Sequence, residues 1–201
     1  IGAVEGIAGA LAAAGITAKV SEIAQAVYDL ANAFSEAEST VVKATGASGE
    51  ALDGLTTSMM NAYAASKSGS LDNAAGAIGE INTRMALTGD ELTDVTGKFL
   101  DFSDITGTDV VGSVQNVTKI MNKWNVEGSE VESVLDKIAY AGQISGVSVD
   151  TLSNTLITGA ASFQEMGLSL DNAISMLAQF ELYGMSGTTA ITAMRTAVKN
   201  F

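Results

Sequence analysis

Residues 146–170 read Gly-Val-Ser-Val-Asp-Thr-Leu-Ser-Asn-Thr-Leu-Ile-Thr-Gly-Ala-Ala-Ser-Phe-Gln-Glu-Met-Gly-Leu-Ser-Leu, one complete unit of a phrase that recurs along the chain. A glycine is followed by a hydroxyl or carboxylate residue, usually by an acidic residue, and then by an apolar run. The glycine can end one helix in the left-handed conformation, and the Ser, Thr or Asp side chain can accept a hydrogen bond from a free amide of the next helix. The acidic residue complements the helix dipole. The phrase therefore predicts a helix that begins near Ser148 and ends near Gly167.

Seven copies of the phrase predict a chain of capped helices, with about twenty residues from one copy to the next from Gly89 onward. They begin at Gly46, Thr88, Thr106, Glu127, Gly146, Gly167 and Gly184. The chain has no proline, so no helix is broken by a missing amide. No stretch alternates apolar and polar residues, so we expect no strand. The predicted fold class is all-α, with eight to ten amphipathic helices: one long N-terminal helix and then a compact array of shorter helices that fold back on one another.

Three segments are expected along the chain. Residues 1–17 are an apolar lead-in rich in Gly and Ala, residues 18–45 a long heptad-patterned helix, and residues 46–201 a compact helical domain. The apolar run from Gly6 to Ile16 spans about 16 Å as a helix, half of a bilayer core. It is interpreted either as a packing helix or as the trailing end of a membrane-active segment. The chain begins with Ile1, and we expect it to be a piece of a longer protein.

The helix at 18–44 carries an apolar stripe at alternating steps of three and four residues. This stripe consists of Val20, Ile23, Val27, Leu30, Phe34, Ala37, Val41 and Ala44. Two interpretations stay open: a core helix of its own domain, or a self-associating coiled coil.

Shorter helices are expected at 49–67, 71–86, 88–102 and 106–124, with further helices opening at Ser129, Ser148, Ser169 and Ser186. Ser70 is expected to cap the second of these. Thr88 with Glu91 and Ser129 with Glu132 have the spacing of capping boxes.

Composition excludes several kinds of chemistry. The net charge of −13 disfavours binding to nucleic acid and to anionic membranes. The chain has no cysteine and no histidine, which rules out disulfides, thiolate zinc sites and a Ser-His-Asp triad. We therefore expect no enzymatic activity, and no catalytic, cofactor-binding or metal-binding residues.

Individual candidates have structural explanations. The carboxylates of Asp101, Asp104 and Asp109 lie around a helix junction without calcium-loop spacing and are expected to be exposed caps. Glu38-Ser39 and Glu132-Ser133 have the Glu-Ser pair of helical peptidoglycan-cleaving enzymes, but the substrate-shaping motif of those folds is missing. Gly69-Ser70 matches no phosphate-binding loop.

Apolar side chains of two kinds are expected in the core. Trp124 is expected to be a core anchor. Most of the methionines fall on apolar stripes, and for these burial is favoured over a promiscuous binding groove. They are Met59, Met60, Met121, Met166, Met176, Met185 and Met194.

The order of several motifs resembles phage tail tape measure proteins over about residues 25–201. The segment from Phe34 to Leu55, with Thr45-Gly-Ala-Ser48 at its turn, looks like the signature of that family. Similar helices follow at Ala74–Leu87, at Val131–Ala141 and between Gly146 and Gly167. The stretch from Gly184 to Arg195 is close to the family's closing pattern, with Met194 where leucine is usual.

The resemblance implies a structural role without cofactors. Tape measure proteins lie in the tail tube of long-tailed phages, prophages or tail-like bacteriocins, set tail length, support tube assembly and assist genome ejection. Implied partners are the tail tube protein, tail-tip or assembly proteins, further copies of the chain (a trimer by analogy) and the host membrane, with no specific nucleic-acid binding. Implied locations are the tube lumen or the tail tip of the virion, after synthesis in the bacterial cytoplasm. The alternatives are a membrane-inserting, pore-forming module and a generic helical scaffold.

Overall fold

The computed structural model describes residues 17–66 and 70–199, and within these ranges the chain is all-α, as predicted. The described part has no strand. Its elements are α2 (Thr17–Thr45), α3 (Glu50–Ala65), α4 (Leu71–Met85), α5 (Gly89–Thr106), α6 (Val110–Trp124), the 3-10 turn η1 (Gly128–Glu130), α7 (Val131–Ser145), α8 (Val149–Glu165), α9 (Leu170–Leu182) and α10 (Gly187–Lys199).

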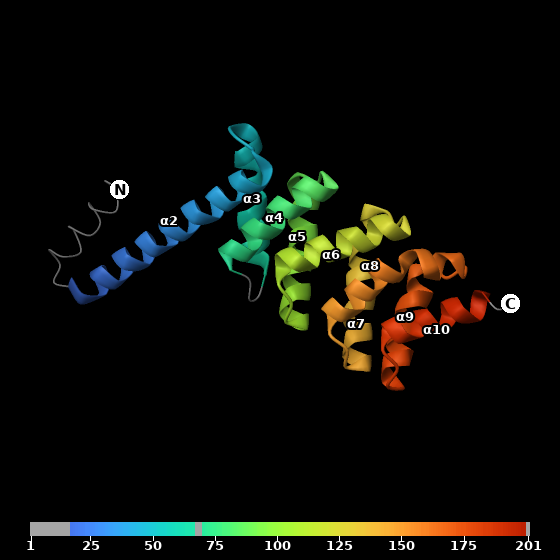
Figure 1. Ribbon diagram of the computed structural model, residues 1–201. Helices are drawn as coiled ribbons and strands as arrows, with labels where there is room; N and C mark the ends of the chain where they lie inside the picture. The colour runs from blue at the N-terminus through green and yellow to red at the C-terminus, as the bar shows by residue number, and fades with distance from the viewer. Residues whose placement is uncertain (1–16, 67–69, 200–201) are drawn as a thin grey trace.

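Alternate helices form two rows that pack against each other. In one row α2, α4, α6, α8 and α10 each contact the next member, and in the other row α3, α5, α7 and α9 do the same. Each helix also packs against its neighbours in sequence, so the chain is a stack of helical hairpins that Figure 1 shows in colour order from blue to red. This arrangement is an α-solenoid.

The repeating unit of the stack is a pair of helices about 39 residues long, within the usual range for helical repeats. In one row the N-caps are Ser70, Asp109 and Ser148. In the other row α3 and α5 follow Gly49 and Thr88, with the same interval. The twenty-residue spacing in the sequence therefore corresponds to a single helix, and two of them make one structural repeat.

Side-chain caps fix the start of several helices where the sequence predicts them. The side chains of Ser70, Ser148 and Ser169 each accept a hydrogen bond from the amide three residues later, at 3.1–3.2 Å. Asp109 does the same for the amide of Gly112 at 2.6 Å, so the predicted cap role of this aspartate is confirmed. Each bond satisfies an amide that has no partner within its helix.

The two predicted capping boxes are wrong. The Thr88 side chain makes no cap hydrogen bond, although α5 begins directly after it. Ser129 lies inside η1 rather than before the first residue of α7, because three residues of 3-10 turn precede that helix. The carboxylate of Glu132 instead lies 2.8 Å from the Lys98 ammonium, a charged partner outside its own helix.

Most helices end in the left-handed conformation that the phrase predicts. Gly107 and Gly146 are the caps of α5 and α7, with φ of 68° and 72°. At α4 and α6 the cap is instead Ala86 or Asn125, with φ of 56° and 53°. Asparagine enters this region readily, whereas alanine does so at a cost of about 1–2 kcal/mol.

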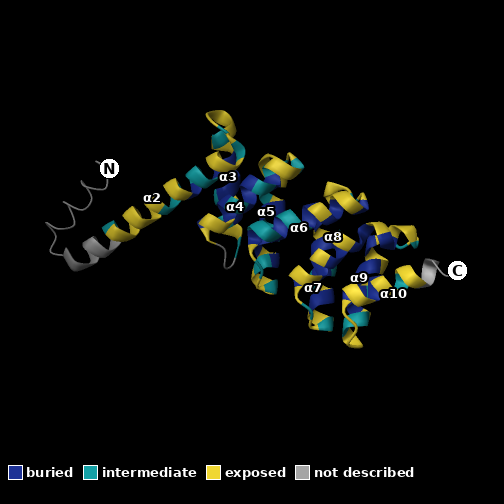
Figure 2. Ribbon diagram, in the orientation of Figure 1, coloured by how far each residue is buried: buried dark blue, intermediate teal, exposed yellow. Residues whose placement is uncertain are grey.

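The core lies between the two rows and between successive hairpins, where Figure 2 shows the buried residues. Its largest fully buried side chains include Phe99, Ile138, Leu156 and Phe163. Burial of each such side chain contributes about 1.5–3 kcal/mol. The core is therefore continuous along the stack, since every hairpin covers the apolar face of the one before it.

Glycines allow two of these helix pairs to approach closely. A Cβ atom on Gly79 of α4 would lie 2.5 Å from Cβ of Ala44 in α2. A Cβ atom on Gly159 of α8 would lie 2.5 Å from Cδ1 of Ile191 in α10. Real Cβ atoms do not come this close, so at both crossings the backbones meet only because a side chain is missing.

The long helix α2 is packed along only part of its length. Ala37 and Val41 are buried, and Thr83 Oγ1 of α4 donates a hydrogen bond to the Ala44 carbonyl. Toward its start Val27 and Leu30 are 43% and 56% exposed, and Figure 2 shows this part extending from the stack. The core interpretation therefore applies to the second half of the stripe, and self-association of the first half stays a prediction.

Candidate interaction surfaces

The candidate features among the described residues are surfaces, ion pairs and hollows. No group of three or more Asp or Glu side chains among them is arranged to hold a metal ion. Every buried side-chain nitrogen and oxygen atom in the described part has a hydrogen-bond partner. The polar groups of the interior are thus used by the fold itself.

The carboxylates singled out in the sequence do not come together. Asp109 caps α6, whereas Asp101 and Asp104 lie exposed within α5, so the expected cap role is wrong for these two. Glu38 lies half-buried on α2, far along the chain from Glu132 on α7. Ser70 of the Gly69-Ser70 pair caps α4, and Gly69 lies outside the described residues.

An ion pair links neighbouring helices of one row and recurs one repeat later. Lys98 Nζ of α5 lies 2.8 Å from the Glu132 carboxylate of α7 and also 2.8 Å from that of Asp94. Lys137 Nζ of α7 lies 2.8 Å from both carboxylate oxygens of Asp171 in α9. The hydrogen bonds to Asp94 and then Glu132 raise the pKa of Lys98 above its ordinary value of 10.5.

The sequence analysis did not identify this repeated clamp. The signal was present, because Lys98 and Lys137 are about 39 residues apart, as are Glu132 and Asp171, and repeats of that length are common in helical stacks. This spacing can be recognised as a repeated ion pair only once the two-helix repeat is known.

Trp124 is a core anchor, as predicted. Its ring stacks on Phe163 of α8 with centroids 6.0 Å apart, and its Nε1 donates to the Leu156 carbonyl at 3.1 Å. Both groups lie on α8, so this side chain ties α6 to the next member of its row.

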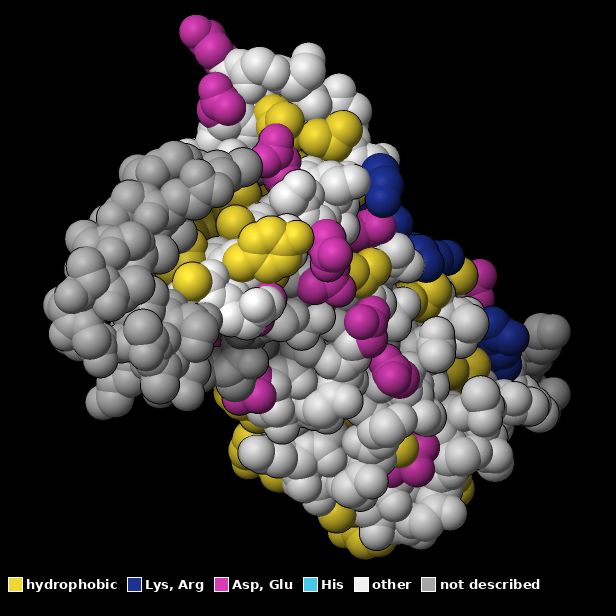
Figure 3. Space-filling view, turned by 90° about the vertical axis from the view of Figure 1, so that its left-hand side faces the viewer, with side chains coloured by type: hydrophobic (Ala, Val, Ile, Leu, Met, Phe, Trp, Pro, Cys, Tyr) yellow, Lys and Arg dark blue, Asp and Glu magenta, His cyan; other side chains and the backbone are white. Residues whose placement is uncertain are grey.

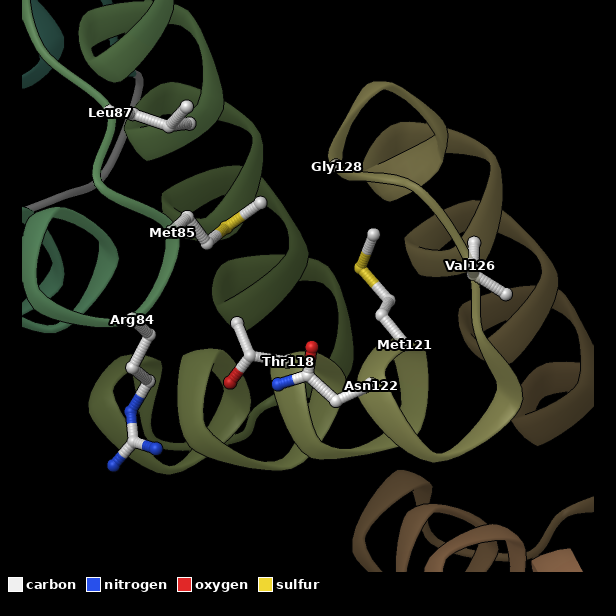
Figure 4. Close-up of a pocket in the computed structure, with 8 residues that line it drawn as sticks. All are labelled: Arg84, Met85, Leu87, Thr118, Met121, Asn122, Val126 and Gly128. Atoms are coloured by element: carbon white, nitrogen blue, oxygen red, sulfur yellow. The ribbon is translucent and has the colours of Figure 1, made fainter.

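A small hollow of about 170 Å³ lies between the ends of α4 and α6. Figure 4 shows Met85 and Met121 pointing into the space between these helices. The guanidinium of Arg84 is held at the side by Glu80 of its own helix. The Thr118 hydroxyl in its lining donates to the Val114 carbonyl of its own helix at 2.7 Å, and we interpret the hollow as imperfect packing between two repeats.

The other methionines mostly follow the core prediction. Met59 and Met121 are buried, and Met60, Met166 and Met176 pack partly buried against the core. Met194 is half-buried. Met185 departs from the prediction, since it is 39% exposed in the turn that connects α9 to α10.

Two wider hollows lie side by side between α5 and α7. Their volumes are about 230 and 310 Å³, and both are lined by Ile105 and Ala139. Phe102 and Leu135 line the first, and the loop residues before α6 and α8 line the second. The apolar lining can hold apolar side chains of another molecule. Charged side chains surround it, with Lys98, Asp101, Glu132 and Asp136 at the first hollow and Asp150 at the second.

The candidate membrane segment from Gly6 to Ile16 lies outside the described residues. Within the described helices, none combines the length and the apolar character needed to cross a bilayer.

Residues 64–201 match the family of phage-related minor tail proteins. The match runs from the end of α3 through all the later repeats and covers more than half of the chain. The chain therefore belongs to the phage-related minor tail protein family, a class of structural proteins of the virion tail. No curated protein and no solved structure matches it.

Proposed function

We propose that the chain is part of a tail tape measure protein, which sets tail length, supports assembly of the tail tube and assists genome delivery. The observation that carries this proposal is the tape-measure-like segment from Phe34 to Leu55, which lies upstream of residues 64–201, the range that matches the minor tail family. Its partners are then the tail tube protein and the tail-tip or assembly proteins, in the tube lumen or at the tip.

The stacked fold suggests how this region takes part. One repeat of 39 residues spans about 58 Å as a continuous helix, because a helix rises about 1.5 Å per residue. Stacked as a hairpin, the same residues advance the row by only about 8–10 Å, one interhelical distance. We propose that this region works as a folded assembly module, while an extended part of the protein supplies the ruler.

Deletion of one whole repeat tests this proposal. Residues 110–148 are removed in frame in the parent phage, which joins Asp109 to Val149 and leaves a cap before α8. Tails are then measured by electron microscopy, with a duplication of the same residues as the matched control. We expect tail lengths that change by less than about 10 Å, or a loss of tail assembly.

Two results would contradict the proposal in different ways. Tails about 58 Å shorter in the deletion, and longer by that amount in the duplication, would make this region part of the extended ruler. Tails of normal length in a phage mutant that lacks the whole protein would show that the protein is not a tape measure.

We also propose that the protein acts without catalysis. Glu132 is the residue on which a peptidoglycan-cleaving activity would depend, and its carboxylate is engaged with Lys98. Purified chain and its Glu132→Gln variant are incubated with peptidoglycan, and release of soluble fragments is measured. Cleavage of peptidoglycan by the parent chain that is lost in the Glu132→Gln variant would contradict this proposal and show that the protein is an enzyme.

Self-association through the start of α2 is the third part of the proposal. Val27 and Leu30 are exposed on one stripe of that helix, as in an unpaired coiled coil. Sedimentation equilibrium should give an oligomer that becomes monomeric in the Val27→Ser/Leu30→Ser variant. An unchanged mass in the variant would exclude this seam, whatever the oligomer number.

A further inference from the structure

Exposed apolar side chains recur at one place in successive repeats. Ile105 of α5, Ile144 of α7 and Leu182 of α9 are 67%, 43% and 55% exposed. Each lies two residues before a glycine with positive φ that ends its helix (Gly107, Gly146 and Gly184). The recurrence in three repeats distinguishes them from apolar residues scattered singly over a surface, which need no explanation.

These positions form a row, because α5, α7 and α9 pack side by side in one layer. The ends of the three helices lie along the lower border of the stack in Figure 1, and Figure 3 shows apolar side chains along that border. Neighbouring members are about 8–10 Å apart, one interhelical distance. Tyr140 and Tyr183 lie on the same helix ends and are 64% and 87% exposed. We call these five residues the apolar edge.

The hollows between α5 and α7 open beside this edge. Ile105 lines both of them, so their combined space lies directly against the first member of the row. An apolar side chain of a partner could enter there, next to Phe102 and Leu135. The surface thus offers an exposed apolar row together with a recess, as docking sites for helices do.

The edge is acidic. Asp101, Glu132 and Asp136 line the first hollow together with Lys98, whose charge is paired with Asp94 and Glu132. Asp150 lines the second hollow, and Asp104 lies in the last turn of α5. The last turns of α5, α7 and α9 contain no basic residue, whereas α2, α4 and α6 each have one in theirs. Because α6, α8 and α10 begin where α5, α7 and α9 end, their helix dipoles oppose each other here. The charge of the edge therefore comes from its side chains.

Charge and spacing define the partner. At this acidic edge, the net charge of −13 opposes the docking of a second copy, a nucleic acid or an anionic membrane. Two turns of a helix, or seven residues, span about 10.5 Å, close to the interval of the row. We propose that the apolar edge binds an amphipathic helix of another protein, with apolar residues at heptad spacing and Lys or Arg on its flanks.

A designed peptide tests this directly on the full 201-residue chain. The probe is an 18-residue fluorescein-labelled helix with leucines in an a/d pattern, lysines at the flanking positions and alanines elsewhere. Binding is followed by fluorescence anisotropy. We expect saturable binding that weakens at least tenfold in the Ile105→Ser/Ile144→Ser/Leu182→Ser variant, and that is lost when the lysines of the peptide are replaced by glutamate.

The matched control removes the same number of exposed apolar side chains elsewhere. Tyr28 and Val42 of α2 are 64% and 37% exposed, and Ala161 of α8 is also exposed. Their replacement by serine should leave peptide binding within twofold of the parent. Circular dichroism confirms that both triple variants remain folded.

Several outcomes would overturn the proposal. One is an equal loss of binding in the two triple variants, which would indicate general attraction between a cationic peptide and an acidic protein. Another is undiminished binding in the edge variant. Equally decisive would be an edge-dependent dimer in sedimentation, or edge-dependent binding to phosphatidylglycerol vesicles, because the occupant would then be a second copy or a membrane.

The test does not depend on the tape measure assignment. The peptide assay reports only on this surface, whereas the tail-length experiment reports on the role of the repeat in the virion. Either proposal can therefore fail while the other stands.

Discussion

At the scale of single residues, the left-handed caps differ in cost. Ala86 ends α4 with φ of 56°, while its amide donates to the Asn82 carbonyl at 2.9 Å. The hydrogen bond needs only the backbone, so the methyl group of Ala86 adds strain without a compensating bond. Glycine adopts the same conformation freely.

Replacing Ala86 by glycine should therefore stabilise the protein by about 1 kcal/mol. Urea unfolding followed by circular dichroism measures the change in the free energy of unfolding. Ala161→Gly, at an exposed position inside α8, is the matched control and should destabilise by about 0.5–1 kcal/mol. If both variants shift stability in the same direction, the cap conformation is not the cause.

The sequence predicted the start of these helices better than their ends. Ser70, Ser148 and Ser169 are recognisable because a hydroxyl before an apolar run has one obvious partner, the free amide. Ala86 and Asn125 carry no such signal. The conformation of Ala86 is imposed where α4 must stop for the chain to turn back, which depends on packing in the hairpin and not on the residue.

At the scale of helices, the closest contact joins α2 to α4 at Gly79 and Ala44. A methyl group at position 79 would collide with the Ala44 side chain, so Gly79→Ala should force the helices apart. We expect a loss of about 1–3 kcal/mol in the free energy of unfolding, typical of overpacking. Thermal unfolding of the purified chain measures it.

Gly97 provides the matched control for this substitution. It lies inside α5, and a Cβ atom there would meet nothing within 4 Å. Gly97→Ala should stabilise by about 0.5–1 kcal/mol, because only helix propensity changes. We expect the free energy of unfolding to fall for Gly79→Ala and to rise for Gly97→Ala. Stabilisation by both substitutions would mean that α2 is not packed as closely as described.

The ion pairs that Lys98 makes with Asp94 and Glu132 predict that the stability of the protein depends on pH. Because hydrogen bonds to Asp94 and Glu132 raise the pKa of Lys98 in the folded state, the stabilisation is fully present below pH 10.5 and is lost as the pH rises through that higher value. Lys98→Met should cost about 1 kcal/mol or less at pH 7, as exposed pairs do. The difference from the parent should shrink above pH 10.5.

Urea unfolding at pH 7, 9 and 11 measures this difference. Lys123→Met, at an exposed lysine of α6, serves as the control for loss of one positive charge. A difference for Lys98→Met that stays constant up to pH 11 would show that its effect comes from packing of the lysine stem.

The helices themselves were predictable, but their partners were not. Expected ranges such as 71–86 and 106–124 lie within a few residues of α4 and α6, because apolar periodicity and caps are local properties. The clamp and the apolar edge depend on which helices lie side by side. An apolar residue stands two positions before the glycine in six of the seven phrases, so this pattern alone does not single out the three members of the edge.

At the scale of the whole molecule, the two-helix period sets which deletions preserve the fold. Removing residues 110–148 takes out one α6–α7 unit and leaves every remaining helix in its own row. We expect a shorter stack that unfolds cooperatively, since stability in such a stack is approximately a sum over repeats and their interfaces.

Removing a single helix should instead disrupt the stack. Deletion of residues 149–169 takes out α8, which shifts α9 into the row that α10 should occupy. Thermal unfolding followed by circular dichroism distinguishes the two products, and only the single-helix deletion should lose its cooperative transition. A folded single-helix deletion would contradict the two-row architecture.

The nearest-neighbour packing of the hairpins also determines how the molecule responds to force. Among the described α-helices, extensive contacts join only those one or two places apart along the chain, so tension applied at the ends of the stack acts on one interface at a time. The hairpins can then unfold one after another, each at a small and similar force. They can refold once the tension is released. A solenoid of this kind can pass through an opening narrower than its folded width in single file, without the one large barrier that unfolding of a globular domain imposes.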